Sequence, residues 1–454
     1  MSLSKKLTSV LVGFLFVVLA SGLAQEKQNQ KQVLELTLQD CLKLALEKNP
    51  YFLAAQAKED EARAQVRQAA ASFFPSLSAQ GTDILDKKVF TVEIPPMYPG
   101  QQPQRVKFDF TRTYQMSLSF SVPVFTSGKL LSNYKQAQYN YQATQESIDQ
   151  ARQETIFNVK RAFYGYLLAR RFVEVAEESV NLAEKHLTNV KNLYEVGMAT
   201  KFDLLRAEVQ LSNLKPQLIR ARNSLEVAEL GLKNLLGLDL NQPIKIKGEL
   251  SFEEKQINLD EAVQKALANR PELHQLNYQK QMAQEMFKLA RAADLPTLAL
   301  GGSLNYWANN LNFRKNTWEN YYTISLVLNV PIFNGFANQA QAARATALAR
   351  QLEYSLKGLA ENIKLEVQQA MLNYQQAKEA LLSQEKNVEQ AEEAVRLAEL
   401  NYSEGLATTL DVTSAQVALS QARTNYAQAL YDCLMALAQL EKATGESALT
   451  GKTD

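Results

Sequence analysis

Histidine and cysteine, the residue types most typical of metal sites and of nucleophilic or acid–base catalysis, are rare in this chain of 454 residues, with two of each. The two histidines, His186 and His274, and the two cysteines, Cys41 and Cys433, form no metal-ligand spacing and no nucleophile signature. The glycine pair at 301–302 lacks the Lys-Ser/Thr that completes a phosphate-binding loop. We therefore predict that the protein is not an enzyme and binds neither a cofactor nor a metal.

Both cysteines stand at positions where we expect burial. Cys41 shares a helical face with Leu38, Leu42 and Ala45, and Cys433 falls on a core position of a predicted coiled coil. Each has the setting of a small apolar core residue. An export signal, described below, also makes a disulfide conceivable, and sequence spacing does not show whether the two sulfurs face each other. Both interpretations stay open.

Two aspartates are distinguished by a repeated motif. The chain reads YEVGMATKFD at 194–203 and YSEGLATTLD at 402–411, an offset of 208 residues. In each copy a glycine ends one helix, a threonine caps the next, and an aspartate completes a capping box: Gly197, Thr200 and Asp203, then Gly405, Thr408 and Asp411. The motif predicts the tip of a helical hairpin, present twice.

The repeat extends over most of the chain. The segment 36–50 aligns with 257–271 at an offset of 221, and VPVFTSG at 122–128 aligns with VPIFNG at 330–335 at an offset of 208. One indel of thirteen residues in the β segment, where the first copy is longer, explains the change. We therefore predict a duplicated architecture.

The expected segments are a signal peptide (1–24), a first repeat (25–237), a connector (238–256), a second repeat (257–445) and a disordered tail (446–454). Each repeat should hold two short helices, a strand pair, a long helix and a returning helix. In the first repeat we expect the strand pair near 76–123, the long helix near 128–195 and the returning helix near 201–236. In the second repeat the same three elements are expected near 297–331, 335–403 and 409–444.

The N-terminus has the layout of a secretory signal peptide. Lys5 and Lys6 precede an apolar run at 7–20, and Ala24 precedes polar Gln25. We expect cleavage after Ala24 and export of the mature chain. After this site no run of 18 apolar residues occurs, so any membrane crossing must use strands. The formal net charge of +1 provides no basic field for nucleic-acid binding.

The long helices carry a narrow apolar seam with steps of three and four residues, the signature of coiled-coil packing. It runs through Val173, Ala176, Val180, Ala183, Leu187, Val190 and Tyr194, and in the second copy through Leu381, Gln384, Val388, Ala391, Val395, Ala398 and Tyr402. We interpret these residues as structural core. One helix of about 65 residues would reach on the order of 100 Å, far more than a globular core requires.

A second pattern predicts strands that cross a membrane. From 106 to 122 the chain alternates, with one face apolar except for Arg112 and the other face polar. This run exceeds the roughly 9–11 residues that a tilted transmembrane strand needs. The predicted lipid-facing residues are Phe108, Phe110, Tyr114, Met116, Leu118 and Phe120. A half-buried sheet of a soluble protein is the alternative.

The second copy alternates less regularly over 321–330. Aromatic residues gather at the presumed strand ends, where a membrane interface would suit them: Tyr306, Trp307, Trp318, Tyr321 and Tyr322. Four strands cannot close a barrel, and open sheet edges are not tolerated in lipid, so several chains must contribute. The sequence therefore predicts a mainly α fold with duplicated coiled-coil hairpins and a transmembrane β segment, forming a tube through an outer membrane.

The duplicated layout, the VPVF and VPIF segments and the paired Y-x-x-G…D turns resemble the TolC-type outer-membrane efflux channel family over about residues 34–445. The resemblance implies a homotrimer with four strands per chain in a twelve-stranded barrel, and a periplasmic tunnel of twelve helices. It implies a passive exit channel of a tripartite efflux or secretion system in the outer membrane of a Gram-negative-type bacterium. The implied partners are a periplasmic adaptor, an inner-membrane pump and outer-membrane lipid.

The resemblance places the periplasmic entrance at the two tips, with an acidic ring on Asp411 and with Asp203, Tyr402 and Ser414 beside it. Ser414 stands where family members can have a second acid, and Ala407 where an arginine can lock the turn. This sequence thus departs from a tightly ion-locked entrance. The implied adaptor contacts are Val196, Gly197, Met198, Ala199 and Thr200, with Glu404, Gly405, Leu406, Ala407 and Thr408. A role for Asp411 as a helix cap alone stays open.

A periplasmic coiled-coil adaptor or a structural protein without a pore is the alternative function. Such a protein would share the export signal, the long hairpins and the need for partners. It would not need the alternation over 106–122 or two matched β segments. This feature favours the channel.

Overall fold

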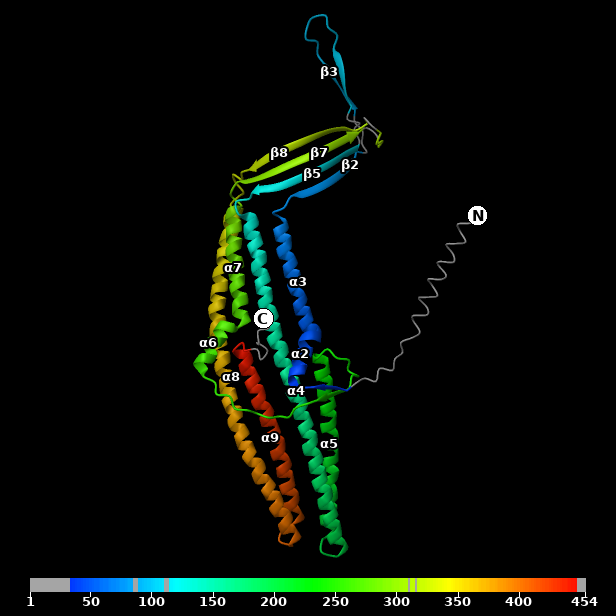
Figure 1. Ribbon diagram of the computed structural model, residues 1–454, viewed down its shortest axis with the longest axis vertical. Coiled ribbons are helices and arrows are strands. Elements are labelled where there is room, and N and C mark those ends of the chain that lie inside the picture. Colours follow the sequence, from blue (N-terminus) through cyan, green and yellow to red (C-terminus); the bar gives the residue numbers. More distant parts are fainter. Residues whose placement is uncertain (1–32, 85–88, 110–113, 309–310, 315–316, 447–454) are drawn as a thin grey trace, which may run out of the picture. The chain divides into compact units, whose positions relative to one another are not determined.

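The structure is a computed structural model that describes residues 33–84, 89–109, 114–308, 311–314 and 317–446. Its helices are α2 (Leu38–Lys48), α3 (Pro50–Ala71), α4 (Lys129–Glu195), α5 (Lys201–Leu235), α6 (Leu259–Asn269), α7 (Pro271–Ala292), α8 (Ala337–Ser403) and α9 (Thr409–Ala443) (Figure 1). Its strands are β1 (Leu34–Leu36), β2 (Ser76–Asp83), β3 (Val89–Ile94), β4 (Gln104–Asp109), β5 (Tyr114–Phe125), β6 (Ile244–Ile246), β7 (Thr297–Ala308) and β8 (Glu319–Asn329). The predicted signal peptide, Phe110 and the predicted tail from 447 onward lie outside the described residues.

The two repeats give long helices of equal length. α4 and α8 have 67 residues each, and the returning helices α5 and α9 have 35 each. A helix of 67 residues has a contour length of about 100 Å. The prediction of a mainly helical chain is confirmed. Within the part of the chain that the structure describes, no helix combines the length and the hydropathy needed to cross a membrane.

The chain forms two compact units, and each takes segments from both repeats. The first unit holds β1, α2, α5 and β6, with the C-terminal parts of α4 and α8 and the N-terminal part of α9. The second holds α3, α6, α7, the remaining strands and the other parts of α4, α8 and α9. Compact units and sequence repeats therefore differ, because the long helices contribute to both units.

In the first unit, residues of the predicted seam form the helical core. Seam residue Val190 is buried with Leu204 and Ala207 at the α4–α5 tip, and seam residues Ala391 and Val395 are buried with Leu419 and Ala422 between α8 and α9. The prediction is wrong at Tyr194, which is 39% exposed. Tyr194 lies in the last turn of α4, where the helix ends, and the Lys201 ammonium lies 5.7 Å from the centre of its ring.

The main sheet of the second unit has four antiparallel strands in the order β2-β5-β7-β8. Its register separates an apolar face from a polar face. Leu77, Phe120, Gly302 and Ile324 form one cross-strand row on the apolar face, and Ser78, Ser119, Ser303 and Thr323 form a row on the polar face. The predicted lipid-facing residues Tyr114, Met116, Leu118 and Phe120 all alternate onto the apolar face of β5.

Gly302 makes room for an aromatic side chain on the apolar face. A Cβ at Gly302 would lie 2.3 Å from the nearest carbon of the Phe120 ring. Only a residue without a side chain therefore lets the ring cover the neighbouring strand, a known device for protecting a glycine in a sheet.

Of the strand predicted over 106–122, the structure describes 106–109 in β4, which pairs with β3, and 114–122 in β5, which pairs with β2 and β7. Residues 110–113 lie outside the described residues. Phe108 thus stands in the β3–β4 hairpin and not in the main sheet. Alternation has the same period in both strands, so it cannot show where one ladder ends and the next begins. Among the described residues the second repeat has no such hairpin, which accounts for the longer first copy.

The connector is more structured than its proline, glycine and charges indicate. Ile244–Ile246 form β6, which pairs in parallel with β1, and Ile246 is buried. Arg170 on α4 fixes the segment after β6, because its guanidinium donates to the carbonyl of Gly248 at 2.5 Å. A three-residue strand leaves no periodic signal, and its partner β1 lies far away in the sequence, at the start of the first repeat.

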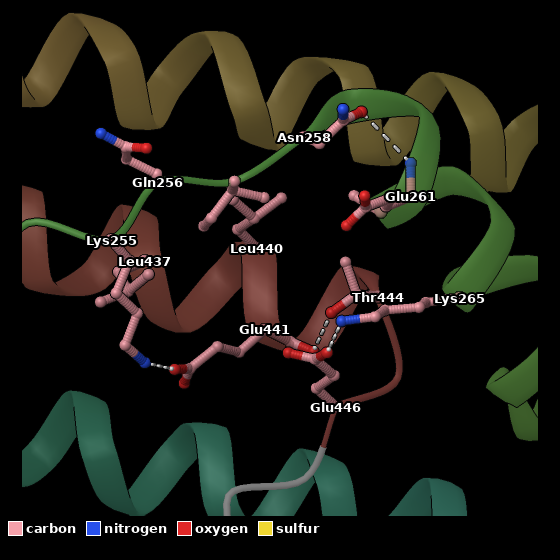
Figure 2. Close-up of a pocket in the computed structure, with 12 residues that line it drawn as sticks. Lys255, Gln256, Asn258, Glu261, Lys265, Leu437, Leu440, Glu441, Thr444 and Glu446 are labelled. Atoms are coloured by element: carbon pink, nitrogen blue, oxygen red, sulfur yellow. Dashed lines mark hydrogen bonds and ion pairs between the residues drawn. The ribbon is translucent and has the colours of Figure 1, made fainter.

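The end of the connector and α6 are joined to the C-terminal end of α9. Lys255 donates to Glu441 at 2.9 Å, and Lys265 donates to Glu446 at 2.7 Å, around a cavity of about 340 Å³ (Figure 2). The charged groups that line this cavity are largely paired with one another. We therefore interpret the cavity as part of the packing of the second unit.

Cys41 and Cys433 are both buried free thiols. Burial raises the pKa of Cys41 to about 12 and that of Cys433 to about 11. Thiols with such pKa values are poor nucleophiles, since the thiolate is the reactive form. The structure therefore supports their interpretation as small core residues.

Candidate functional site at the helical tips

Both tips have the predicted turn. Gly197 and Gly405 adopt the left-handed conformation, with φ of +80° and +75°. In each tip the amide of the residue after the glycine donates at 2.8 Å to a carbonyl near the end of the long helix. This hydrogen bond across a left-handed glycine is the Schellman ending of a helix. The two tips therefore repeat one backbone geometry.

Each returning helix begins with the predicted capping box. The Asp203 amide donates to Thr200 Oγ1 at 3.2 Å, and the Thr200 amide donates to Asp203 Oδ2 at 3.1 Å. The same two bonds measure 3.4 Å and 2.8 Å between Asp411 and Thr408. The Thr408 amide and hydroxyl hold the pKa of Asp411 below its ordinary value, and the Thr200 hydroxyl does the same for the pKa of Asp203. Both carboxylates are therefore ionised at neutral pH.

The tips expose apolar surface beside this charge. Asp411 and Ser414 are exposed. Val196, Met198 and Leu406 expose 69%, 77% and 80% of their surface. Exposed apolar side chains that gather in one region are typical of a protein-binding surface.

Tyr402 connects the two tips within the first unit. Its ring packs against the buried cluster of Val190, Leu204 and Ala207. Its hydroxyl accepts a hydrogen bond from Thr409 Oγ1 at 3.3 Å. The Thr409 hydroxyl also helps to lower the pKa of Asp203. Tyr402 and Asp203 thus share one network, whereas among the described residues no hydrogen bond joins Ser414 to it.

A second set of contacts joins the hairpins farther along the helices. Arg423 on α9 donates to Glu178 on α4 and to Glu392 on α8, the latter at 2.9 Å. Ser179 Oγ donates to Ser420 Oγ at 3.0 Å. Sequence reasoning missed these contacts, because polar residues on a helix surface give no sign of which distant helix they face.

His186, which belongs to no motif in the sequence, packs behind the tips. It is buried, and its ring centre lies 5.4 Å from that of Tyr402. Its Nε2 atom has no hydrogen-bond partner among the described residues. Burial lowers the pKa of His186, and nearby Glu399 acts in the opposite direction. Its position three residues after Ala183 and four before Val190, on the apolar seam, was the signal that could have identified it.

We expect the tip packing to loosen as the pH falls below about 6.5, the ordinary pKa of histidine. Because burial lowers the pKa in the packed state, the opened chain binds the proton more readily than the closed one. The stability that neutral His186 gives to the tip packing is therefore fully present above the ordinary pKa of histidine. It is lost as the pH falls toward the lowered pKa of the buried ring. Hydrogen-exchange protection over 187–195 should decrease about threefold between neutral pH and about pH 5.5, after correction for intrinsic rates.

The control is His186→Phe, which keeps an aromatic ring against Tyr402 and removes the proton-binding group. Its protection should not depend on pH over this range. Equal pH dependence in wild type and His186→Phe would assign the effect to other groups.

The sequence profile described as "Outer membrane efflux protein" matches residues 41–238 and 262–446. The chain is 25% identical over 322 residues to the outer membrane protein TolC of Vibrio cholerae, covering 68% of this chain and 70% of TolC. It is 25% identical over 425 residues to the alkaline protease secretion protein AprF of Pseudomonas aeruginosa, covering 90% and 84%. Its fold is similar to the Campylobacter jejuni CmeC outer membrane channel, with a TM-score of 0.74 at 17% identity and coverage of 90% and 85%.

The matched residues cover both repeats and both tips, which defines an outer-membrane protein of the efflux class. The chain belongs to the outer membrane efflux protein family. The predicted resemblance to TolC-type proteins and the predicted outer-membrane location are confirmed.

Proposed function

We propose that this chain is the exit channel of a tripartite efflux or secretion system, and that three copies form the conduit. The observation that carries this proposal is the two-faced sheet with open edges. Among the described residues, β2 pairs only with β5 and β8 pairs only with β7. An apolar face suits outer-membrane lipid, but unpaired edges are costly there, so each edge needs a strand from another copy. Three sheets of four strands would give a twelve-stranded barrel.

The helical part would form the periplasmic section of the same conduit. The long helices have a contour length of about 100 Å, and their hairpins carry partly exposed apolar residues that a neighbouring copy could cover. Four long helices per chain would give a tunnel of twelve helices. The tunnel transports substrate passively, and the driving force comes from an inner-membrane pump.

The exposed tips are the proposed contact surface for a periplasmic adaptor. The contact residues are Val196, Gly197, Met198, Ala199 and Thr200, with Glu404, Gly405, Leu406, Ala407 and Thr408. The exposure of Val196, Met198 and Leu406 supports this role, because burial of apolar side chains of this size under a partner stabilises the complex. The geometry of the left-handed glycines would orient both loops toward the same partner.

Asp411 is the proposed charged residue of the periplasmic entrance. Both carboxylates are ionised, but Asp411 is exposed, whereas Asp203 is half-buried and shares a network with Tyr402 through Thr409. Three Asp411 carboxylates in one ring would attract cations and repel anions. Helix capping and the entrance role are compatible, since only one carboxylate oxygen takes part in the capping bonds given above.

Asp411→Asn tests the channel and the entrance together, because the asparagine amide oxygen can still accept the hydrogen bond from the Thr408 amide but the side chain carries no charge. Purified trimers in a planar bilayer should give discrete current steps. In a potassium chloride gradient, the cation-to-anion permeability ratio of Asp411→Asn should be lower than that of wild type by about twofold. Asp203→Asn is the matched control, since it makes the same change in the same motif of the other tip.

An equal effect of Asp203→Asn, or no effect of Asp411→Asn, would remove Asp411 from the entrance and leave it as a cap. A protein that gives no current steps and stays soluble without detergent would contradict the channel itself. The alternative of a periplasmic coiled-coil adaptor would then be preferred.

A further inference from the structure

The polar face of the four-stranded sheet carries a cavity of about 340 Å³. The side chains that characterise it are three amides, a threonine and two large aromatic residues: Gln80, Gln115, Asn305, Thr82, Trp307 and Tyr321. Every residue that lines the cavity is uncharged. The cavity therefore differs from the serine and threonine rows nearer the helices, which offer hydroxyl groups but no aromatic surface.

Strand register explains why these residues come together. Gln80, Ser117, Asn305 and Tyr321 form one cross-strand row. Thr82, Gln115, Trp307 and Glu319 form the next row on the same face, and of these Glu319 does not line the cavity. Side chains of neighbouring rows on one face of a sheet lie within reach of each other. Four strands from two distant repeats thus build one continuous surface.

The lining has hydrogen-bonding groups available to a ligand. Within the described part of the chain, no residue hydrogen-bonds to the side chains of Gln80, Gln115 or Tyr321. Asn305 uses its Nδ2 group to donate to Ser303 Oγ at 2.8 Å, which orients its amide. Each amide offers both donors and an acceptor, and the tyrosine hydroxyl offers one of each.

This combination fits one class of ligand. Sugar hydroxyls both donate and accept hydrogen bonds, as the amides do, and the C–H faces of a sugar ring pack against aromatic rings. An ionic ligand would find no counter-charge among the residues that line the cavity, and an anionic one would also lie near Glu319, which stands opposite Trp307. A wholly apolar ligand would leave the amides without partners, which is unfavourable. The face is opposite to the apolar one, so a soluble sugar reaches it more directly than a sugar attached to a membrane lipid.

We propose that this surface, formed by Gln80, Gln115, Asn305, Trp307 and Tyr321, is a binding site for neutral oligosaccharides. The proposal rests on the proposed function in one respect, since the polar face must be open to water in the assembled protein. It adds a ligand class and a location that the channel function alone does not require.

Tryptophan fluorescence tests the site without a conducting pore. The chain has two tryptophans, Trp307 and Trp318, so Trp318→Phe leaves Trp307 as the only reporter. The full-length protein carrying this change is titrated with maltohexaose in lauryldimethylamine oxide, because detergents with sugar head groups would compete. A saturable change in Trp307 emission is expected.

Tyr321 and Tyr322 provide a matched pair of variants. They are neighbours on β8 and point to opposite faces, since Tyr321 pairs with Asn305 and Tyr322 pairs with Leu304. In the same background, Tyr321→Ala should weaken maltohexaose binding about tenfold, and Tyr322→Ala should leave it unchanged. Gln115→Ala should also weaken it, whereas the charged sugar glucuronate should not bind in any variant.

No saturable change in the reporter protein would overturn the proposal, and so would equal weakening by Tyr321→Ala and Tyr322→Ala. Current steps in a planar bilayer, measured on the same preparation, keep this result separate from the channel function. Steps without sugar binding would reject the site and leave the channel intact, and binding without steps would support the site independently of conduction.

Discussion

Arg270→Ala is expected to lower the free energy of unfolding by about 3–5 kcal/mol, the typical cost of removing one partner from a buried ion pair. Arg270 is 7% exposed and stands at the junction of α6 and α7. Its guanidinium donates to Glu272 at 3.1 Å and to Glu366 on α8 at 3.0 Å. It also donates to the carbonyls of Lys442 and Ala443, at 3.4 Å and 3.3 Å.

These last two bonds matter because the final carbonyls of a helix have no partner within it. Arg270 supplies a hydrogen-bond donor to the end of α9, and its bond to Glu366 joins α9 to α8. Its loss would remove this donor from two carboxylates and from the Ala443 carbonyl, whereas the Lys442 carbonyl would keep the hydrogen bond from the Gly445 amide at 3.1 Å. Loss of helical circular dichroism in guanidinium chloride measures the effect as a shift of the unfolding midpoint.

Lys265→Ala is the matched control. Lys265 also forms an ion pair, with Glu446 at 2.7 Å, but both side chains are about half exposed. Exposed pairs of this kind contribute about 0–1 kcal/mol. Similar midpoints for Arg270→Ala and wild type would show that the guanidinium is not a structural link. Arg270→Lys should be intermediate, since lysine keeps the charge and loses the planar fork.

Gly237→Ala is expected to cost about 3 kcal/mol or more, because two penalties combine. Gly237 follows α5 in the left-handed conformation, with φ of +64°. A Cβ there would also lie 2.4 Å from the carbonyl oxygen of Lys48, at the end of α2. Because the obstructing atom belongs to the backbone, a side-chain rotation cannot relieve the clash. The same unfolding measurement gives the size of the effect.

Gly197→Ala separates the two penalties. Gly197 has φ of +80°, but nothing lies within 4 Å of a Cβ built on it. Alanine there should cost only the backbone term, about 1 kcal/mol. Equal losses for Gly197→Ala and Gly237→Ala would show that the contact with α2 gives way easily. Gly445 is the equivalent of Gly237 in the second repeat. The loss for Gly445→Ala should fall between those of the other two variants, since a Cβ built on Gly445 would lie 3.1 Å from the Cβ of Asn269.

The tips were predicted well because their chemistry is local. The left-handed glycines and the capping boxes depend on hydrogen bonds between residues three to five apart, so the residues that form them stand next to each other in the sequence. The same holds for the seam, apart from Tyr194, where the end of α4 leaves the side chain exposed. The roles of these residues in an entrance or in adaptor binding stay predictions.

The strands were predicted less well because pairing is not local. Alternation correctly assigned the faces of β5 and β8 but did not show that β4 and β5 have different partners, since both strands have the same period. The pairing of β6 with β1 had no signal at all in a run of three residues. His186 was noted in the sequence, but only the packing of α4 against Tyr402 gives it a partner and a lowered pKa.

By itself, the sequence determined the duplication, the long helices, the two tips and the two-faced strands. Each of these depends on the spacing of residue types along one segment, which fixes helix period, strand period or turn type. Only the tertiary structure decided the strand order β2-β5-β7-β8, the network of Asp203, Thr409 and Tyr402, and the aromatic and amide cavity on the polar face. These features join residues from both repeats, and periodicity within a segment carries no information about which distant segment will pack against it.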